Sequence, residues 1–386
     1  MAHVLHVINR FGTSGGAENQ LYNNLRRFSH PELTHSVAHV FRRDLDDPLP
    51  DIPKHALFGV GETPGRMAII RALDRYVMET RPDILHCSLA EAALAARVVG
   101  RRRRIPVVES LVNISHDPVR TVDNPSVSSL KLAGHRMLDR ITMRQVTRFH
   151  ALTQAVARSW QANVGIPAGR VVIIPRGIDV ESFDHRAAVD RAALRQSIGV
   201  APDAPMLLNV ARQEPQKGQR YLLEALPAIA ERHPEVVAVF AGRDGNSSPM
   251  LRTLVSDLGI ERHVLFLGVR DDVPALLMAA DVFVFPSLFE GLGVSLLEAM
   301  AGGGAACAVS DAPPFGEIVD PGTTGVMFRS ADANALAVTV SALLADPETR
   351  AKMSEAARAE VMANYRIEAV TRRLEDMYLG MLAERR

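Results

Sequence analysis

The chain of 386 residues is poor in several features that mark particular protein classes. Its only cysteines, Cys87 and Cys307, rule out a disulfide framework, and both stand in apolar stretches that suit buried thiols in a reducing cytoplasm. Lysine plus arginine equals aspartate plus glutamate at 44 each, so no overall charge attracts nucleic acid. Any site for an anion must therefore be built by local groups.

Long apolar runs are missing too. The richest stretch, residues 273–289, is interrupted by Pro274 and Asp281, whereas a membrane helix needs roughly 18 or more apolar residues in succession. The first 12 residues hold too short an apolar run for a signal peptide and end in a glycine turn, so we read them as a first strand. We expect no membrane span.

Short β-branched runs alternate with longer amphipathic segments along the chain. This alternation is typical of βαβ units and predicts an α/β protein with mostly parallel sheets. The predicted strands are 4–8, 35–40, 84–87, 107–111, 149–152, 171–174, 206–210, 236–241, 264–267, 282–285 and 305–309. Since open sheets seldom exceed about 10 strands, we expect two sheets.

Two domains are expected, because a single core seldom grows to this length. The turn Pro175-Arg176-Gly177 marks a boundary near residues 175–200, giving α/β domains at 1–180 and 200–366. Residues 367–386 follow as a helix with an apolar face spaced by three and four. We expect this helix to pack back on the first domain.

Two carboxylates flank a glycine turn after the strand at 282–285. Glu290 precedes Gly291 and Gly293, and Glu298 lies in the helix that follows. Glycines let backbone N–H groups approach a diphosphate at a helix start, and a carboxylate there can accept hydrogen bonds from sugar or ribose hydroxyls. On spacing alone, an ordinary solvated glutamate pair explains the pattern equally well.

Two cations follow the strand at 206–210. Arg212 and Lys217 lie on a loop at the same carboxyl edge, where a guanidinium and an ammonium can hold a diphosphate and take up charge on a departing nucleotide. Such a pair would make a metal ion unnecessary. Either cation seen alone would more often be an ordinary surface residue.

A third glycine cluster, residues 12–18, follows the first strand. It lacks the G-x-G-x-x-G spacing of dinucleotide binders, which disfavours hydride transfer. It forms either a tight turn facing a ligand cleft or merely the opening of the first helix.

Together these motifs resemble glycosyltransferase family 4, a retaining group with the GT-B fold, in which two Rossmann-like doubly wound domains face a central cleft. The resemblance implies that Arg212 and Lys217 hold the diphosphate, that Glu290 lies near the transferred sugar, and that Glu298 binds ribose. The remaining donor-side groups that it implies are Gly15, Gly16, Gly291, Leu292, Gly293 and Val294.

One residue of the family pattern is out of place. Family members usually carry a histidine just after the strand at 107–111, where this chain has Val112 or Asn113. The nearest histidine is His116. With Glu290, either His116 or Asn113 is expected near the reacting sugar, or the site uses neither, since a loop histidine without a chemical role is as common.

The expected activity is transfer of a hexosyl group from a nucleotide diphosphate sugar to a hydroxyl of a sugar or lipid-linked acceptor, with retention and with no cofactor or metal. This chemistry would serve glycan, polysaccharide or glycolipid biosynthesis. Two alternatives share the donor site: a nucleotide-sugar epimerase, which needs no acceptor, and a catalytically silent nucleotide-binding subunit.

Two charged patterns remain. Asp44-Leu45-Asp46 lies in an arginine-rich, proline-bounded loop without partner ligands, so we reject a metal site there. Arg136, Arg140 and Arg144 are spaced by four, which puts them on one helix face that either meets anionic lipid or is simply solvated. We expect a cytoplasmic protein, with peripheral contact at the inner face of a membrane and no nucleic-acid partner.

Overall fold

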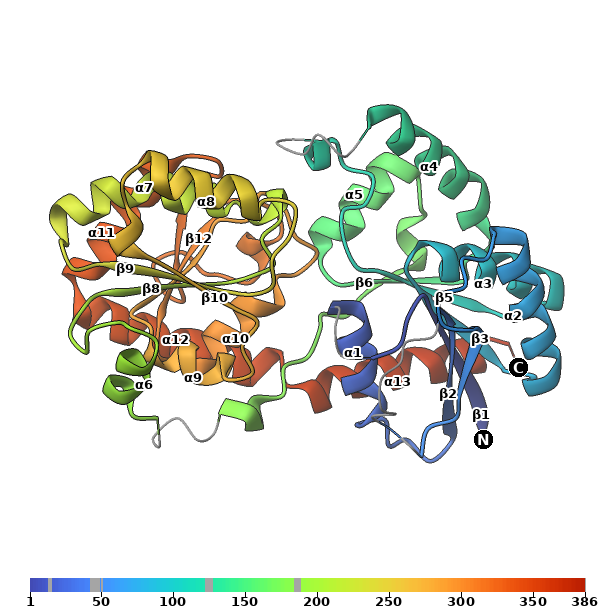
Figure 1. Cartoon of the computed structure of the whole chain (residues 1–386). Coiled ribbons are helices and arrows are strands. Elements are labelled where there is room, and N and C mark those ends of the chain that lie inside the picture. Colours follow the sequence, from blue (N-terminus) through green and yellow to red (C-terminus); the bar gives the residue numbers. More distant parts are fainter. Residues whose placement is uncertain (13–15, 42–48, 50, 122–127, 184–188, 386) are drawn as a thin grey trace. The chain divides into compact units, whose positions relative to one another are not determined.

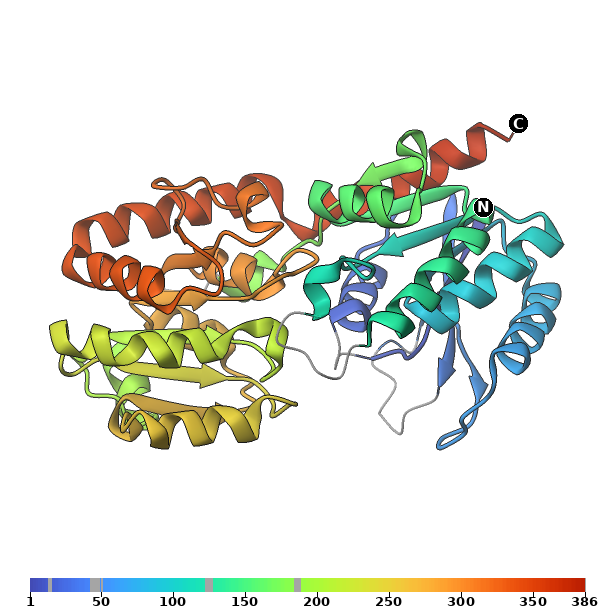
Figure 2. The ribbon, with the colours of Figure 1, turned by 90° about the horizontal axis from the view of Figure 1, so that it is seen from above.

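A computed structural model of the chain describes residues 1–12, 16–41, 49, 51–121, 128–183 and 189–385 (Figure 1). Its residues form two compact units. Unit 1 comprises Met1–Asp117, Ser128–Gly177 and Ile367–Arg386, and unit 2 comprises Ile178–Arg366 with the short segment Pro118–Val127. Each unit contains one parallel sheet with helices on both of its faces (Figure 2).

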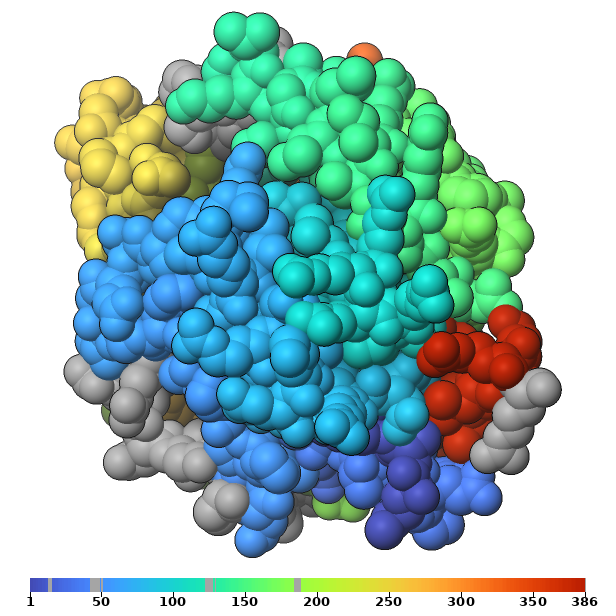
Figure 3. All heavy atoms as spheres, turned by 90° about the vertical axis from the view of Figure 1, so that its right-hand side faces the viewer, coloured from blue at the N-terminus to red at the C-terminus, as the bar shows by residue number. Residues whose placement is uncertain are grey.

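Unit 1 has a seven-stranded sheet in the order β3-β2-β1-β4-β5-β6-β7. Its strands are β1 (Ala2–Ile8), β2 (Leu33–Phe41), β3 (Lys54–Phe58), β4 (Ile84–Ser88), β5 (Val107–Leu111), β6 (Arg148–Ala151) and β7 (Val171–Ile173). Its helices are α1 (Gly16–Leu25), α2 (Arg66–Thr80), α3 (Ala90–Arg103), α4 (Ser129–Thr142), α5 (Gln154–Val164) and α13 (Ile367–Ala383), with short turns η2 (Met143–Gln145) and η3 (Ala168–Arg170). Figure 3 views the side that carries α2 and α3 in blue and cyan, with the end of α13 in red.

Helix α13 packs on the sheet of unit 1 although it ends the chain. Its buried residues Leu374 and Tyr378 share a core with Val4, Ile84 and Val108 of the strands. Burial of each such side chain contributes roughly 1.5–3 kcal/mol. The carboxylate of Glu375 adds two hydrogen bonds, accepting from the backbone N–H groups of Ser29 and His30 at 2.7 and 2.8 Å.

A glycine lets the chain pass close to the start of α13. A Cβ added at Gly177 would lie 2.4 Å from Cα of Ile367, a distance that no side chain tolerates. The turn Pro175-Arg176-Gly177 therefore needs glycine at its third position, because the backbone of Ile367 occupies the space a side chain would fill.

Unit 2 has a six-stranded sheet in the order β10-β9-β8-β11-β12-β13. Its strands are β8 (Met206–Val210), β9 (Val237–Ala241), β10 (Val264–Gly268), β11 (Val282–Phe285), β12 (Ala306–Ser310) and β13 (Val326–Phe328). Its helices are α6 (Arg191–Ser197), α7 (Gln219–Arg232), α8 (Ser248–Asp257), α9 (Val273–Ala279), α10 (Val294–Gly302), α11 (Ala333–Ala345) and α12 (Pro347–Asn364). The strand order reverses between β8 and β11, which creates the kind of crevice where open α/β sheets bind ligands.

The predicted α/β class with two parallel sheets is confirmed, and each strand predicted from an apolar run corresponds to an observed strand. Strands β3 and β13 were not among those ranges. β3, with the sequence KHALF, has no buried residue, and β13 has only three residues, so neither carries a strong apolar signal. Among the described residues, no helix is both long and apolar enough to cross a membrane.

Candidate functional site

The clearest polar cluster of unit 2 lies at the carboxyl ends of β8 and β11. Lys217 ends the turn η5 (Pro215–Lys217) after β8, and Glu290 follows β11. The Lys217 Nζ lies 2.5 Å from Oε1 of Glu290, and Ser287 Oγ donates to the same oxygen at 3.1 Å. Both charged side chains are largely buried, at 15% and 9% exposure. The buried ammonium of Lys217 thus compensates the charge of the buried Glu290 carboxylate. Either charge buried without the other would be strongly destabilising.

Two backbone features hold these loops together. Gly218 has φ 62°, and a Cβ there would lie 2.0 Å from the carbonyl oxygen of Pro286. The N–H of Leu288 donates to the carbonyl of Gln216 at 2.8 Å. The loop after β8 therefore contacts the loop after β11 through its backbone, which fixes the position of Lys217 relative to Glu290.

The start of α10 completes the same edge. Its N-cap, Gly293, has φ 87°, and an added Cβ would lie 2.9 Å from the ring of Phe315. The N–H groups of Val294 and Ser295 lie in the first turn, where no earlier carbonyl of the helix can accept from them. Gly291 and Leu292, both buried, lead into this turn. Amide groups at a helix start favour an anion.

Glu298 lies in the second turn of α10 and is half-buried. Burial raises the pKa of its carboxyl to about 7. Hydrogen bonds donated by ligand hydroxyls would favour the charged form and lower that pKa. Glu298 is thus placed to respond to a hydroxyl-bearing ligand at neutral pH.

Arg212 belongs to the same strand-end loop but has a different partner. Its side chain is 49% exposed, and Nη1 lies 3.7 Å from Oε1 of Glu214. The structure therefore brings Lys217 and Glu290 into direct contact, whereas the guanidinium of Arg212 lies near Glu214.

In unit 1, Gly16 begins α1, and Gly15 lies outside the described residues. A Cβ at Gly16 would lie 2.8 Å from Nη1 of Arg176, so glycine permits this guanidinium to approach the helix start. From the sequence, Arg176 is expected only as part of the turn at residues 175–177. No local pattern signals its position, because it depends on where the end of β7 meets α1.

Arg176 also lines a small cavity of ≈ 50 Å³ between the sheet, α1 and α13. A cavity of this size holds water molecules. Its polar lining consists of His6, Gln20, Asn24, His86, Ser88, Ser110, His150, Arg176 and Tyr378.

Four of these residues form one hydrogen-bonded chain. The hydroxyl of Tyr378 lies 2.5 Å from Nδ1 of His86, and His86 Nε2 lies 2.7 Å from Ser110 Oγ. Ser110 Oγ lies 2.9 Å from His150 Nδ1, and His150 Nε2 lies 2.8 Å from the carbonyl of Ile174. The chain links α13 to β4, β5 and β6.

The proton positions in this hydrogen-bonded series follow from its last acceptor, the carbonyl of Ile174. Burial keeps His86 and His150 neutral by lowering their pKa, that of His150 to about 4. A carbonyl can only accept, so His150 donates through Nε2 and accepts through Nδ1 from Ser110. Ser110 then accepts from His86 Nε2, and His86 Nδ1 accepts from Tyr378. Each hydrogen bond of the series is therefore donated in the direction that leads away from α13.

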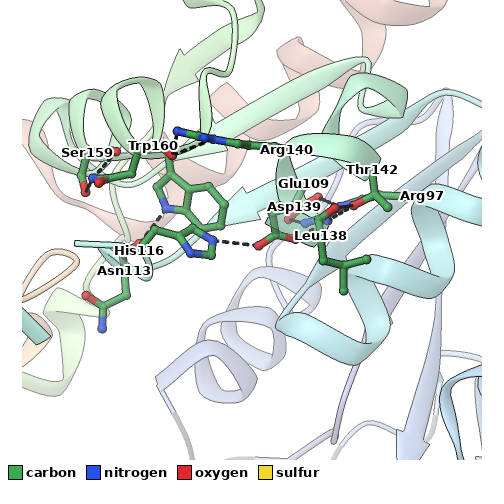
Figure 4. Close-up of polar contacts among 11 residues, drawn as sticks. Arg97, Glu109, Asn113, His116, Leu138, Asp139, Arg140, Thr142, Ser159 and Trp160 are labelled. Atoms are coloured by element: carbon green, nitrogen blue, oxygen red, sulfur yellow. Dashed lines mark hydrogen bonds and ion pairs between the residues drawn. The ribbon is translucent and has the colours of Figure 1, made fainter. Parts of the chain in front are cut away.

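His116 is held inside unit 1 by a charged network (Figure 4). It is 4% exposed, its Nε2 lies 2.7 Å from Oδ2 of Asp139, and its ring meets Trp160 edge-on at 4.6 Å. Burial opposes the charge of Asp139, yet hydrogen bonds from His116 and Arg97 keep its pKa below the usual value. Arg97 also pairs with Glu109 at 2.5 Å. These contacts hold the His116 ring through its Nε2 and against Trp160.

Asn113 lies nearer the strand end. Its carbonyl accepts from Nε1 of Trp160 at 2.8 Å, and its side-chain oxygen accepts from the N–H of Ile114. Figure 4 shows its amide pointing away from the His116 and Asp139 pair. Of the two candidates, Asn113 is the one whose side chain is not engaged by the charged network.

Of the two other charged patterns in the sequence, the structure describes the three arginines but not the aspartate pair. Asp44-Leu45-Asp46 falls outside the described residues, and within the described ranges no group of three or more His, Cys, Asp or Glu could hold a metal. Arg136 and Arg140 lie on α4, where Arg140 donates to the carbonyl of Asn163 at 3.0 Å, and Arg144 is exposed in η2.

Profiles of two glycosyltransferase families match consecutive parts of the chain. "Glycosyltransferase Family 4" matches residues 14–182, and "Glycosyl transferases group 1" matches residues 190–360. Between them they cover the greater part of both units.

The chain is similar to named transferases. It is 24% identical to an Escherichia coli UDP-Gal:alpha-D-GlcNAc-diphosphoundecaprenol alpha-1,3-galactosyltransferase, over 83% of this chain and 81% of that protein. It is 29% identical to a GDP-mannose-dependent alpha-(1-6)-phosphatidylinositol monomannoside mannosyltransferase of Mycolicibacterium smegmatis, over 76% and 72%.

Solved structures agree on the fold. Anabaena Alr3699/HepE, in complex with UDP and glucose, superposes with a TM-score of 0.80 at 22% identity, over 98% of this chain and all of that one. The sucrose-phosphate synthase of Thermosynechococcus elongatus gives 0.81 at 19% identity over the full length of both. The two family profiles show that the chain belongs to glycosyltransferase family 4, and its two Rossmann-like sheets, each with a reversal of strand order, match the GT-B fold of these structures.

Proposed function

We propose that this glycosyltransferase moves a hexosyl group from a nucleotide diphosphate sugar to a hydroxyl acceptor with retention of configuration. The observation that carries the proposal is the ion pair of Lys217 and Glu290 beside the start of α10. It places an ammonium, a carboxylate and helix amides at one edge of unit 2. A sugar diphosphate needs these three kinds of group.

The diphosphate is assigned to Lys217, Arg212 and the N–H groups of Leu292, Gly293 and Val294. Because Lys217 contacts Glu290, the two side chains can bind the phosphate and the sugar of one donor molecule. Arg212 is exposed enough to turn from Glu214 toward a ligand. In this proposal cations and amides stabilise the leaving phosphate, so that no metal ion is required.

The sugar and ribose are assigned to the two carboxylates. Glu290, joined to Lys217 and Ser287, contacts the transferred sugar, and Glu298 accepts from ribose hydroxyls. The leaving phosphate itself helps to deprotonate the acceptor hydroxyl, which makes a protein nucleophile unnecessary.

On the side of unit 1 we assign Gly15 and Gly16 to the turn that faces donor and acceptor. Asn113 is preferred to His116 near the reacting sugar, because Asp139 and Trp160 hold His116 in the interior. Relatives whose names specify diphosphoundecaprenol or phosphatidylinositol acceptors support a lipid-linked sugar as acceptor.

A lipid-linked acceptor implies contact with a membrane surface, and α4 has the features for it. Leu130, Met137 and Ile141 of α4 are 83%, 59% and 57% exposed. Because successive residues of a helix are turned by about 100°, these three side chains lie within a narrow arc of the helix surface. Exposed Arg140 borders this arc, while Asp139 points inward to Arg97. An apolar face with flanking cations suits an anionic membrane surface.

Co-flotation with phosphatidylglycerol vesicles tests this contact. Leu130→Gln with Ile141→Gln should strongly reduce flotation, whereas Val338→Gln, at a 60% exposed position of unit 2, should not. Equal flotation of all variants would exclude α4 as the membrane-binding element.

The donor site is tested by thermal unfolding with UDP or GDP and by transfer from the matching sugar nucleotide. Lys217→Ala should remove most of the nucleotide-induced rise in Tm and lower turnover by roughly 100-fold or more. Lys352→Ala, which removes an exposed lysine paired with Glu348, is the control and should behave like wild type.

Wild-type turnover in the Lys217→Ala variant would refute the assignment. Incubation with donor alone separates the alternatives: an epimerase would change the sugar of the free nucleotide, and a silent subunit would bind it without any product. The transferase names of the relatives favour transfer.

A further inference from the structure

Unit 1 carries a basic hollow away from the carboxyl edge of its sheet. Four exposed arginines, Arg101, Arg104, Arg144 and Arg385, line an open hollow of ≈ 580 Å³. A hollow of this size is within the range of small-molecule sites. The remaining lining residues, Gly100, Ile105, Pro106, Gln145 and Thr147, are uncharged. We call this hollow the arginine groove.

Its position separates it from the proposed chemistry. Arg104 lies shortly before β5, separated from it by Ile105 and Pro106, and Arg144 lies shortly before β6. The groove is therefore at the amino edge of a parallel sheet, whereas ligands of the fold bind at the carboxyl edge. Figure 3 views this side, where the red end of α13 adjoins cyan and green surface.

The fold gathers these cations from three segments. The carbonyls of Gly100 and Arg101 accept from the N–H groups of Ile105 and Arg104, which closes a tight turn at the end of α3. Arg385 reaches that turn from the chain end, since its Nη2 donates to the carbonyl of Arg104 at 3.2 Å. The guanidinium of Arg385 is thus held against the rim formed by α3.

Neighbouring acids are committed to other arginines. Asp74 pairs with Arg102 and Arg103 at 3.2 and 2.7 Å, and Glu384 pairs with Arg148 at 2.5 Å. Across residues 1–12, 16–41, 49, 51–121, 128–183 and 189–385, no salt bridge to a groove arginine is found. Four like charges around one hollow repel each other, and an anion between them would relieve the repulsion.

We propose that the arginine groove is an anion site for a ligand with several phosphate oxygens. Guanidinium groups bind phosphate through forked hydrogen bonds, and groups from three segments can surround a phosphate from different sides. Such a ligand is either a soluble diphosphate or the phosphate of an anionic lipid. The site is independent of the donor site of unit 2.

Calorimetric titration with inorganic pyrophosphate tests the proposal. Wild type should bind at two classes of site, the groove and the donor site. Arg104→Gln with Arg385→Gln should weaken one class by on the order of tenfold and leave the other and the turnover unchanged. Arg232→Gln with Arg372→Gln, two exposed positions with the same loss of charge, is the matched control.

Lys217→Ala separates the two sites. If it removes all pyrophosphate binding, the groove does not bind soluble diphosphate and the donor assignment stands. If only the groove variant loses binding, the donor assignment fails and the groove stands.

Flotation in the Leu130→Gln and Ile141→Gln background distinguishes the lipid source. Residual binding to phosphatidylglycerol vesicles, absent with phosphatidylcholine and lost in the groove variant, identifies a lipid phosphate. If the groove substitutions change neither pyrophosphate nor vesicle binding beyond the matched control, the proposal is overturned.

Discussion

At the scale of single residues, Glu298 has the most informative environment in unit 2. Its carboxyl is half-buried on α10, and burial alone raises its pKa to about 7. A neutral carboxyl can donate one hydrogen bond, whereas the carboxylate can only accept. Ribose hydroxyls that donate to Glu298 therefore bind best to its charged form.

Donor affinity should consequently rise with pH. Below about 7, binding of a sugar nucleotide must displace a proton from Glu298, which weakens affinity by up to about tenfold per pH unit. Above that pH the carboxylate is present before binding and the dependence levels off. Calorimetric Kd values between about pH 5.5 and about pH 8.5 measure this profile, because the bridging phosphates of a sugar nucleotide do not titrate there.

Glu298→Gln removes the titrating group while preserving its size. Its donor affinity should be low and independent of pH in the same range, and Glu348→Gln, an exposed control, should keep the wild-type profile. The full wild-type slope in the Glu298→Gln protein would show that another group titrates.

The residue pairs differ in how far the sequence predicts them. Lys217 and Glu290 are 73 positions apart, yet both follow strands of one parallel sheet, so their proximity at one edge was predictable. The approach of Arg176 to Gly16 was not, because it depends on α1 meeting the end of β7. The burial of His116 was equally hidden, since its partner Asp139 comes from a helix packed over it.

At the scale of elements, strands with buried apolar runs were predictable and edge strands were not. The four residues of β11, VFVF, are all buried and read clearly as a strand. Strand β3, at the edge of the unit 1 sheet, leaves all its residues at least partly exposed, so no apolar pattern marks it. The spacing of apolar residues also predicted α13, but not its polar link to the sheet.

That link gives α13 a testable anchor. Tyr378 is fully buried and donates to Nδ1 of His86 at the start of the hydrogen-bonded chain. Tyr378→Phe leaves this nitrogen buried without a donor, which should lower the free energy of unfolding by about 1–3 kcal/mol. Urea denaturation followed by far-UV circular dichroism measures the change.

The control is Tyr365→Phe in unit 2. Tyr365 is 9% exposed, and its hydroxyl takes part in no hydrogen bond found among the described residues, so its removal should cost about 0.5 kcal/mol or less. Equal destabilisation by both substitutions would mean that loss of the hydroxyl as such, and not the chain to His86, carries the effect.

At the scale of the whole molecule, alternation of strands and helices predicted two doubly wound sheets, but not the order of their strands. Strand order depends on which segments pair after long crossovers, and apolar runs carry no such information. The resemblance added the family and its GT-B fold, because several short motifs occur in one order along the chain. Unit 1 also recruits α13, which lies far from the rest of the unit in sequence.

Because the chain forms two compact units, binding of a nucleoside diphosphate should protect one of them most. The proposed contacts come from residues 211–218 and 290–298 of unit 2. Hydrogen exchange with and without UDP or GDP, whichever raises Tm, should therefore slow most in peptides from these two segments. Amides of α13 and β4 in unit 1, far along the chain from the proposed contacts, serve as the internal reference. Lys217→Ala should abolish the protection at the same ligand concentration, because the ammonium that holds the phosphates is gone. Protection confined to unit 1 would show that the nucleotide binds outside residues 211–218 and 290–298, which would overturn the proposed donor site.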